Sequence, residues 1–365
     1  MITVPKSDLI RAVSRCASIA SARSPMPVLS CVLVESDGER VTVTSTDMFT
    51  ATRATVQCAT GEASFAVQAR DLLERLKHMP DGSVSLAHEK GRLRLSAPKS
   101  SRRYDMLAHD GSEFPNVIVA TEDGAPPIVI AGDVLARAID SVSYAVSVDE
   151  TRAHVNSALL EIGDGVLRLV ATDGHRLSKF ETTVDSGETV SALVPLKSLL
   201  EIRKMCGASS VALRVSGPNI YIETDDGVLS AKLVNAQFPP WKQIVPIERT
   251  RVRAPRSALE SAIDSCGLVA RAGKSSGVKL TFLPGLVRVS AATPEGGEAV
   301  DEVACDTPVG MVEISVGFAP QYITAPLSAL DCADVIIDVG DELAPLTITA
   351  VDDVRFLAVV MPMKL

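Results

Sequence analysis

The chain has 365 residues, of which 46% are hydrophobic and 4% aromatic, and its formal net charge at pH 7 is −9. This length suffices for two or three domains, each with its own hydrophobic core. No stretch approaches the roughly 18 consecutive apolar residues of a membrane-spanning helix, and residues 1–6 lack the features of a signal peptide. We therefore expect a cytoplasmic protein, and the low aromatic content argues against stacking on single-stranded nucleic acid.

The seven cysteines are scattered singly, and no two form a Cys-x-x-Cys pair. An odd count without pairing is typical of reduced, mostly buried thiols, and it disfavours both a disulfide framework and a zinc site. We expect no metal ion and no cofactor.

The elements at the start of the chain alternate between helices and strands. Residues 5–20 have apolar side chains at helical spacing, which predicts a helix. Alternating stretches such as 41–44 and 92–95 predict antiparallel strands with one face in water. Residues 69–79 predict a second helix, and Asp-Gly pairs mark the turns between strands. The order is therefore helix, strands, helix, strands.

This order recurs twice more along the chain. Leu9, Leu135 and Leu259 take the same place in three similar helix openings, 126 and then 124 residues apart. Further recurring frames are Val67 to Leu73 with Val194 to Leu200 and Phe318 to Ile323, Ser45 to Asp47 with Ala171 to Asp173 and Ala292-Thr293, and Phe114-Pro115 with Phe238-Pro239 and Met361-Pro362. A domain-sized period indicates one domain repeated three times. The predicted domains cover residues 1–122, 126–247 and 250–365.

Charge differs between the predicted helices and the rest of the chain. The helices together are net positive, although the whole chain is acidic. Arg11 and Arg15 are four residues apart and Lys197 and Lys204 are seven apart, so each pair shares one helix face. This segregation is compatible with a nucleic-acid partner despite the net charge, and ordinary solvated helix faces are the alternative.

The most distinctive motif is Val170-Ala-Thr-Asp-Gly-His-Arg-Leu177. On a strand, Asp173 and His175 would share a face, while Gly174 would leave the backbone approachable. The pair would suit acid–base catalysis, but no GxSxG, HExxH or P-loop motif accompanies it. We therefore favour a binding pocket edged by this segment over a small-ligand enzyme that uses residues 172–177.

This octapeptide, the triplication, Glu113-Phe-Pro-Asn-Val117 and Val359-Val-Met-Pro-Met-Lys-Leu365 together resemble the bacterial DNA polymerase III β subunit family, the replication sliding clamps. The resemblance runs from Met1 to Leu365. It implies an α+β fold of three clamp-type domains, each with two helices on antiparallel sheets. It also implies a head-to-tail homodimeric ring, with helices inside and sheets outside, that encircles duplex DNA without reading its sequence.

The function that follows from the resemblance is that of a processivity factor, not an enzyme. Such a ring tethers the replicative polymerase to DNA, and it is loaded by a clamp loader. A specialised clamp paralogue that serves one polymerase or repair pathway is the alternative. No membrane partner is implied.

The resemblance further implies a groove for short apolar peptides of the polymerase, the clamp loader and other proteins. The matching wall residues are Val155, Thr172, Gly174, His175, Arg176, Leu177, Pro239, Gln243, Ile244, Ser275, Tyr322, Leu343, Pro345, Val359, Val360, Met361, Pro362, Met363 and Lys364. Gln243 stands where the family often has Arg, Ser275 where a larger apolar residue can sit, and Lys364 where Arg is usual. These departures predict an altered peptide preference rather than loss of the groove.

Cations on the helices and nearby loops would face the DNA in such a ring. The DNA-facing residues are Arg11, Arg15, Arg23, Arg70, Lys77, Arg102, Lys197 and Arg203. Residues 147–154 can touch DNA in relatives, but Asp149 and Glu150 in this segment count against that role here.

Overall fold

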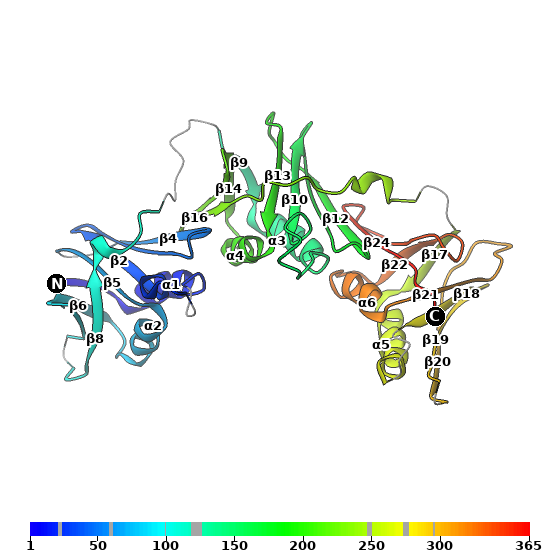
Figure 1. The fold of residues 1–365 in the computed structure, drawn as a ribbon, viewed down its shortest axis with the longest axis horizontal. Coiled ribbons are helices and arrows are strands. Elements are labelled where there is room, and N and C mark those ends of the chain that lie inside the picture. Colours follow the sequence, from blue (N-terminus) through cyan, green and yellow to red (C-terminus); the bar gives the residue numbers. More distant parts are fainter. Residues whose placement is uncertain are drawn as a thin grey trace. The chain divides into compact units, whose positions relative to one another are not determined.

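The computed structural model describes residues 1–20, 24–57, 61–98, 100–117, 126–246, 250–272, 277–294 and 296–365. The chain divides into two compact units, one made of residues 1–133 and 204–233 and the other of residues 134–203 and 234–365. Figure 1 labels many of their elements. None of the helices in the described ranges combines the length and the hydrophobicity that a membrane span needs.

The first unit is built on one antiparallel sheet of 12 strands. In sheet order these are β1 (Ile2–Pro5), β6 (Ser83–Glu89), β7 (Arg92–Ser96), β8 (Arg103–Asp110), β5 (Glu62–Gln68), β2 (Cys31–Asp37), β3 (Arg40–Thr46), β4 (Thr50–Gln57), β16 (Gly227–Lys232), β15 (Asn219–Thr224), β14 (Ser210–Ser216) and β9 (Ile128–Ala131). The pairing of β4 with β16 joins the first repeat to the second, with Ala51 opposite Ser230.

Helices α1 (Lys6–Ala17) and α2 (Ala69–His78) pack against each other in this unit, and α1 also lies on β3 and β4 (Figure 1). Both end earlier than predicted. Beyond Ala17 the chain closes into a tight turn, in which the N–H of Ile19 donates to the carbonyl of Cys16 at 3.1 Å. Met79 is extended because it precedes Pro80, whose ring disfavours a helical conformation for the residue before it.

The second unit contains an antiparallel sheet of eight strands and another of four. The first consists of β13 (Val190–Pro195), β10 (Ser157–Gly163), β11 (Val166–Thr172), β12 (Arg176–Thr183), β24 (Phe356–Val360), β23 (Leu346–Ala350), β22 (Asp334–Val339) and β17 (Thr250–Pro255), and the second of β20 (Glu298–Ala304), β19 (Leu286–Ala292), β18 (Val278–Leu283) and β21 (Ile314–Phe318). The pairing of β12 with β24 joins the second repeat to the third, with Leu177 opposite Val359.

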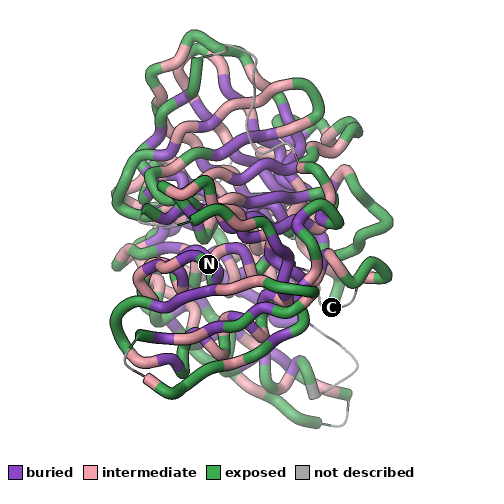
Figure 2. The backbone as a smooth tube through the Cα atoms, turned by 90° about the vertical axis from the view of Figure 1, so that its left-hand side faces the viewer, coloured by how far each residue is buried: buried purple, intermediate pink, exposed green. Residues whose placement is uncertain are grey.

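Four more helices and three short 3₁₀ helices complete the described elements. They are α3 (Gly132–Ser143), α4 (Leu196–Met205), α5 (Arg256–Ala272), α6 (Pro320–Ser328), η1 (Pro27–Ser30), η2 (Gly111–Glu113) and η3 (Trp241–Gln243). Helix α5 packs on β18, β19 and β20 and against α6. Buried residues follow the strands, whereas exposed residues gather at the turns between them (Figure 2).

Strand register defines which residues of the three repeats correspond. Lys232 donates its N–H to the carbonyl of Phe49 at 2.8 Å, and Met361 donates its N–H to that of His175 at 2.9 Å. Met361 therefore corresponds to Lys232 and not to Phe238, so the predicted match between Met361-Pro362 and the earlier Phe-Pro pairs was wrong. The sequence suggested the wrong match because Met-Pro resembles Phe-Pro. The hydrogen bonds between strands, and not this resemblance, determine which residues correspond.

The register also corrects the third copy of the Thr-Asp motif. Val170 pairs with Leu159, and Ser290 pairs with Lys279 at the corresponding place of the third repeat. Ala292 therefore takes the place of Thr172, and Thr293 lies one position beyond it. The predicted domain ends at residues 122 and 247 lie outside the described residues, so those boundaries stay a prediction.

Candidate functional site

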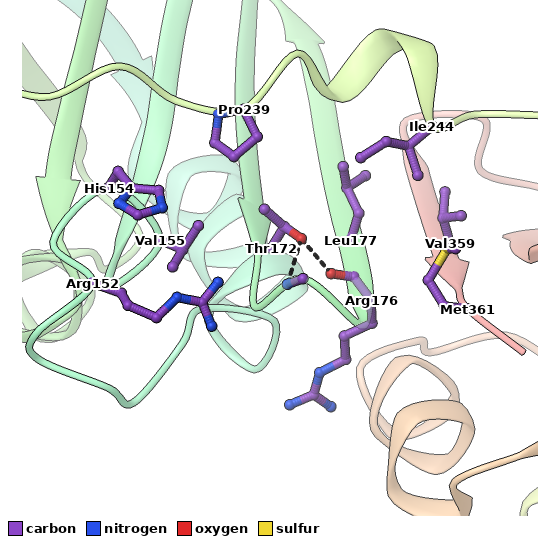
Figure 3. Close-up of a pocket in the computed structure, with 11 residues that line it drawn as sticks. Arg152, His154, Val155, Thr172, Arg176, Leu177, Pro239, Ile244, Val359 and Met361 are labelled. Atoms are coloured by element: carbon purple, nitrogen blue, oxygen red, sulfur yellow. Dashed lines mark hydrogen bonds between the residues drawn. The ribbon is translucent and has the colours of Figure 1, made fainter. Parts of the chain in front are cut away.

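A groove of about 190 Å³ opens in the second unit, between segments that are distant in sequence (Figure 3). Its lining residues are Arg152, His154, Val155, Thr172, Gly174, Arg176, Leu177, Pro239, Ile244, Val359 and Met361. Most of these side chains are apolar, and the charged ones among them are all basic. The groove therefore suits an apolar ligand and disfavours a positively charged one.

The floor of the groove is rigid because it belongs to a packed cluster. Leu177 on β12 and Val359 on β24 face each other across the strand pair, and each is 1% exposed. Both pack with Trp241 of η3. Ile244 follows η3 and donates its N–H to the carbonyl of Trp241 at 3.1 Å, so this short helix fixes the wall that closes over the floor (Figure 3).

One side of the groove is a turn, where the sequence predicted a strand. Residues Asp173 to His175 connect β11 to β12, and Gly174 has a φ of +96°, which favours glycine. Asp173 Oδ1 accepts the N–H groups of His175 and Arg176 at 2.8 and 3.0 Å. The expected shared strand face of Asp173 and His175 is therefore wrong, because the carboxylate is engaged in holding the turn.

Thr172 closes the same turn from inside. Its hydroxyl donates to the carbonyl of Arg176 at 2.7 Å and accepts the N–H of Gly174 at 3.1 Å. The first repeat builds an equivalent turn, in which the hydroxyl of Thr46 donates to the carbonyl of Thr50 at 3.0 Å. The recurring Thr-Asp pair is therefore a structural motif for a tight turn.

Arg176 ties this turn to the third repeat. Its guanidinium lies over the rings of Tyr144 and Tyr322, at 5.4 and 4.9 Å from their centroids, and its Nε is 3.0 Å from Asp173 Oδ2. The ring of His175 stacks on Tyr322 at 5.7 Å. Burial raises the pKa of the Tyr144 hydroxyl well above its ordinary value, so this group stays protonated. These contacts hold the basic side of the groove in place.

The C-terminal segment supplies the opposite wall. Val359 and Met361 line the groove, whereas Val360 is fully buried in the core of the third repeat. Alternate residues of a strand point to opposite faces, so Val360 cannot share the face of its neighbours. The prediction that Val360 is a wall residue is corrected on this ground.

The other predicted wall residues are not among the residues that line the groove. His175 and Tyr322 stack beside it, Gln243 lies in η3, Leu343 and Pro345 lie between β22 and β23, and Pro362, Met363 and Lys364 continue past Met361. Ser275 lies outside the described residues. Sequence reasoning missed Arg152 and His154 as lining residues, although it had singled out residues 147–154. Only the fold shows that Arg152 reaches the carbonyl of Asp173, at 3.4 Å.

Several predicted DNA-facing cations have carboxylate partners. Arg15 is 3.2 Å from Asp226, which is 211 residues away in sequence, and Arg203 is 2.7 Å from Asp140. Arg11 is 3.4 Å from Asp8, and Arg102 donates to the carbonyl of His78. Arg70, Lys77 and Lys197 are exposed on their helices, and Arg23 lies outside the described residues. The helix charge is therefore less available than the sequence indicates.

Three family models match successive parts of the chain. They describe the N-terminal, central and C-terminal domains of the DNA polymerase III beta subunit, and they match residues 1–118, 129–240 and 242–364. The chain belongs to the DNA polymerase III beta subunit family. The family and the function predicted from the sequence are confirmed: this is a sliding clamp, a non-catalytic processivity factor.

Individual relatives cover the chain from end to end. The beta sliding clamp of Pseudomonas aeruginosa is 28% identical over 371 residues, which span 100% of this chain and 99% of the relative. That of Caulobacter vibrioides is 27% identical, with the same coverage.

Solved structures of the family also match the whole chain. The crystal structure of the P. aeruginosa subunit has a TM-score of 0.93 at 26% identity and covers all of both chains. A second P. aeruginosa structure, bound to griselimycin, has a TM-score of 0.92 at 26% identity and covers 100% and 99% of the two chains. The predicted α+β fold of three clamp domains is confirmed by these matches.

Proposed function

We propose that two copies of this chain close a ring around duplex DNA in the cytoplasm and that the groove binds a short apolar segment of a DNA polymerase or a clamp loader. The observation that carries the proposal is the groove itself, because Leu177 and Val359 of its floor come from two different repeats of a clamp fold. The basic lining and the buried apolar floor suit a peptide with large apolar side chains.

The repeats themselves support a two-chain ring. Inside the chain, β4 pairs with β16 and β12 pairs with β24 to join successive repeats. The third repeat offers β20, the counterpart of β4 and β12, at the end of its four-stranded sheet. The first repeat offers β8, the counterpart of β16 and β24, whose residues 103–107 pair with β7 alone among the described strands. Joining β20 of one copy to β8 of another repeats the same junction and closes a head-to-tail ring.

Contact with DNA in such a ring would be weak and independent of sequence. Exposed cations such as Arg70 and Lys77 attract phosphates, while pairs such as Arg203–Asp140 reduce the local charge. Phosphate contacts of this kind weaken as salt rises, because binding releases counterions. A closed ring would remain on DNA by topology and would still slide along it.

A retention experiment tests the proposal. The clamp, loaded by a clamp loader onto a nicked circular plasmid, should stay bound during gel filtration and should leave once the plasmid is linearised. Native mass spectrometry should give about 77 kDa, twice the 38.5 kDa of one chain. Equal retention on circular and linear DNA, or a monomer at micromolar concentration, would rule out the ring.

A further inference from the structure

The C-terminal segment that forms one wall of the groove is held at two points. The N–H of Met361 donates to the carbonyl of His175 at 2.9 Å, and the N–H of Met363 donates to the carbonyl of Gly317 on β21 at 2.8 Å. Met361, which makes the first bond, lines the groove. Its position therefore depends on how Met363 and Leu365 lie against β21.

Two glycines leave the space that this segment occupies. A Cβ at Gly317 would lie 2.6 Å from the carbonyl oxygen of Met363 and 2.6 Å from Cγ of Leu365. A Cβ at Gly277 would overlap Cδ2 of Leu365 and would lie 3.0 Å from Sδ of Met363. Neither glycine has a φ in the left-handed region. Lack of a side chain, and not backbone freedom, is what these positions require.

The corresponding position in the other repeats carries a side chain. Strand register places Ala66 of β5 and Leu193 of β13 where β21 has Gly317. Ala66 packs with Phe114 in the first repeat, and Leu193 packs with Trp241 in the second. In each repeat, a residue from the segment after the last strand thus covers this position.

The hydrogen bond from Met363 to the carbonyl of Gly317 does not itself require glycine. Val234 donates its N–H to the carbonyl of Leu193 at 2.9 Å, and this is the counterpart of the bond from Met363 to Gly317. Glycine at 317 instead gives Leu365 the room that the side chain of Leu193 fills in the second repeat. The segment can lie close to β21 only because the strand has no side chain there.

We propose that Gly317 is a positioning residue of the groove: it seats Met363 and Leu365 on β21 and thereby places Met361 in the groove wall. This inference rests on the proposed function, because it assumes that the groove binds an apolar ligand. The affinity of the groove then depends on a position that does not line it.

Three glycine variants test the proposal in a graded way. Gly317→Ala conflicts with a backbone oxygen, which no side-chain rotation relieves, so affinity for griselimycin should fall on the order of tenfold. Gly277→Ala conflicts with the mobile ends of two side chains and should have a smaller effect. Gly163→Ala, at a glycine with no atom within 4 Å of the added Cβ, is the control and should bind like the wild type. Fluorescence titration measures all three.

A deletion of residues 363–365 distinguishes positioning from a general structural effect. In that background the three atoms nearest to the added Cβ, which belong to Met363 and Leu365, are absent, so Gly317→Ala should not change the remaining affinity. Thermal unfolding of each variant shows whether stability changes in parallel. If Gly317→Ala weakened binding equally with and without residues 363–365, the proposal would be overturned.

Hydrogen exchange decides the inference independently of any ligand. Mass spectrometry of the fragment containing residues 357–365 should show faster exchange in Gly317→Ala than in the wild type, because the bonds of Met361 and Met363 loosen. Unchanged exchange would contradict the positioning role. If the wild type bound neither griselimycin nor a short apolar peptide but the exchange result held, the proposed ligand of the groove would be wrong and the positioning role would stand.

Discussion

The N–H of Met361 donates to the carbonyl oxygen of His175 at 2.9 Å, and this bond joins the end of the last strand to a turn almost two hundred residues earlier in the chain. It brings the C-terminal wall of the groove next to the basic side that carries Arg176. The same bond recurs between Lys232 and Phe49. After Lys232 the chain continues into the rest of the second repeat. After Met361 only the last four residues of the sequence follow, and Met361 itself lines the groove.

Removing the C-terminal wall should abolish ligand binding. Deletion of residues 361–365 removes Met361 and exposes the floor at Val359, so we expect no measurable binding of a short apolar peptide by calorimetry. A ligand that buries roughly 300–400 Å² of apolar area gains about 8–10 kcal/mol before ordering costs, so wild-type affinity should be micromolar. Size exclusion should show an unchanged dimer. A deletion variant with wild-type affinity would refute the groove assignment.

Thr172 and Thr46 form a matched pair for testing the turn. Thr172→Ala and Thr46→Ala each remove a buried hydroxyl that bonds across an equivalent turn, so each should lower the free energy of unfolding by about 1–2 kcal/mol. Urea unfolding measures this loss. Of these two, Thr172→Ala alone should also weaken binding of a short apolar peptide, by several-fold, because Thr172 lines the groove and Thr46 does not. Equal effects of both variants on affinity would contradict a local role.

The ion pair between Arg203 and Asp140 should set the strength of contact with DNA. Arg203→Glu and Lys197→Glu should shorten retention on circular DNA at moderate salt, whereas Asp140→Asn should lengthen it. Because these side chains are at the surface, unfolding free energies should change by about 0.5 kcal/mol or less.

A matched control separates local from total charge in that experiment. Glu223→Gln removes one negative charge from a pair with Arg214 on a sheet, where Glu223 is 3.1 Å from Arg214. It should leave retention unchanged. If Glu223→Gln lengthened retention as much as Asp140→Asn, only the net charge would matter.

Subunit contact should depend on the free part of β8. Leu107 on this strand is 74% exposed in one chain, so Leu107→Asp should not disturb the fold but should convert the dimer to monomer at micromolar concentration. Leu268→Asp, on α5 with 65% exposure, makes the same change elsewhere and should leave the dimer intact. Analytical ultracentrifugation reads out both. A dimeric Leu107→Asp variant would argue against the proposed β8–β20 junction.

Acid should weaken the third repeat through Asp353. Hydrogen bonds from Arg355 hold the pKa of Asp353 below its ordinary value of 3.8, and Arg137 adds to this effect at 2.8 Å. A lowered folded-state pKa stabilises the fold above the ordinary value, and the contribution is lost as pH falls through the folded value. Asp353→Asn should therefore lose less unfolding free energy than the wild type between pH 5 and about pH 2.

Denaturant unfolding at several pH values measures this difference. Asp352→Asn, at the exposed neighbouring residue, is the control for the loss of one charge. It should retain the acid sensitivity of the wild type. A parallel pH profile for Asp353→Asn and the wild type would show that this carboxylate does not carry the effect.

The sequence alone determined the three-fold repeat, the presence of the helices, the Asp-Gly turns and the family. Periodic apolar residues predict local structure because a helix or a strand must bury one face. Leu9, Leu135 and Leu259 recur for this reason. Nine of the predicted wall residues, from Val155 to Met361, line the groove. The sequence could predict them because they match a family motif residue by residue.

Only the tertiary structure decided how these segments meet. The alternation of β24 buries Val360 between two groove residues, and the turn at Asp173 replaces a predicted strand. Arg152 reaches the groove, and Arg15 meets Asp226, through contacts between distant residues. Sequence spacing carries no signal for such contacts, because they arise from strand pairing and packing across the whole chain, whereas periodicity reports only the face that each element buries.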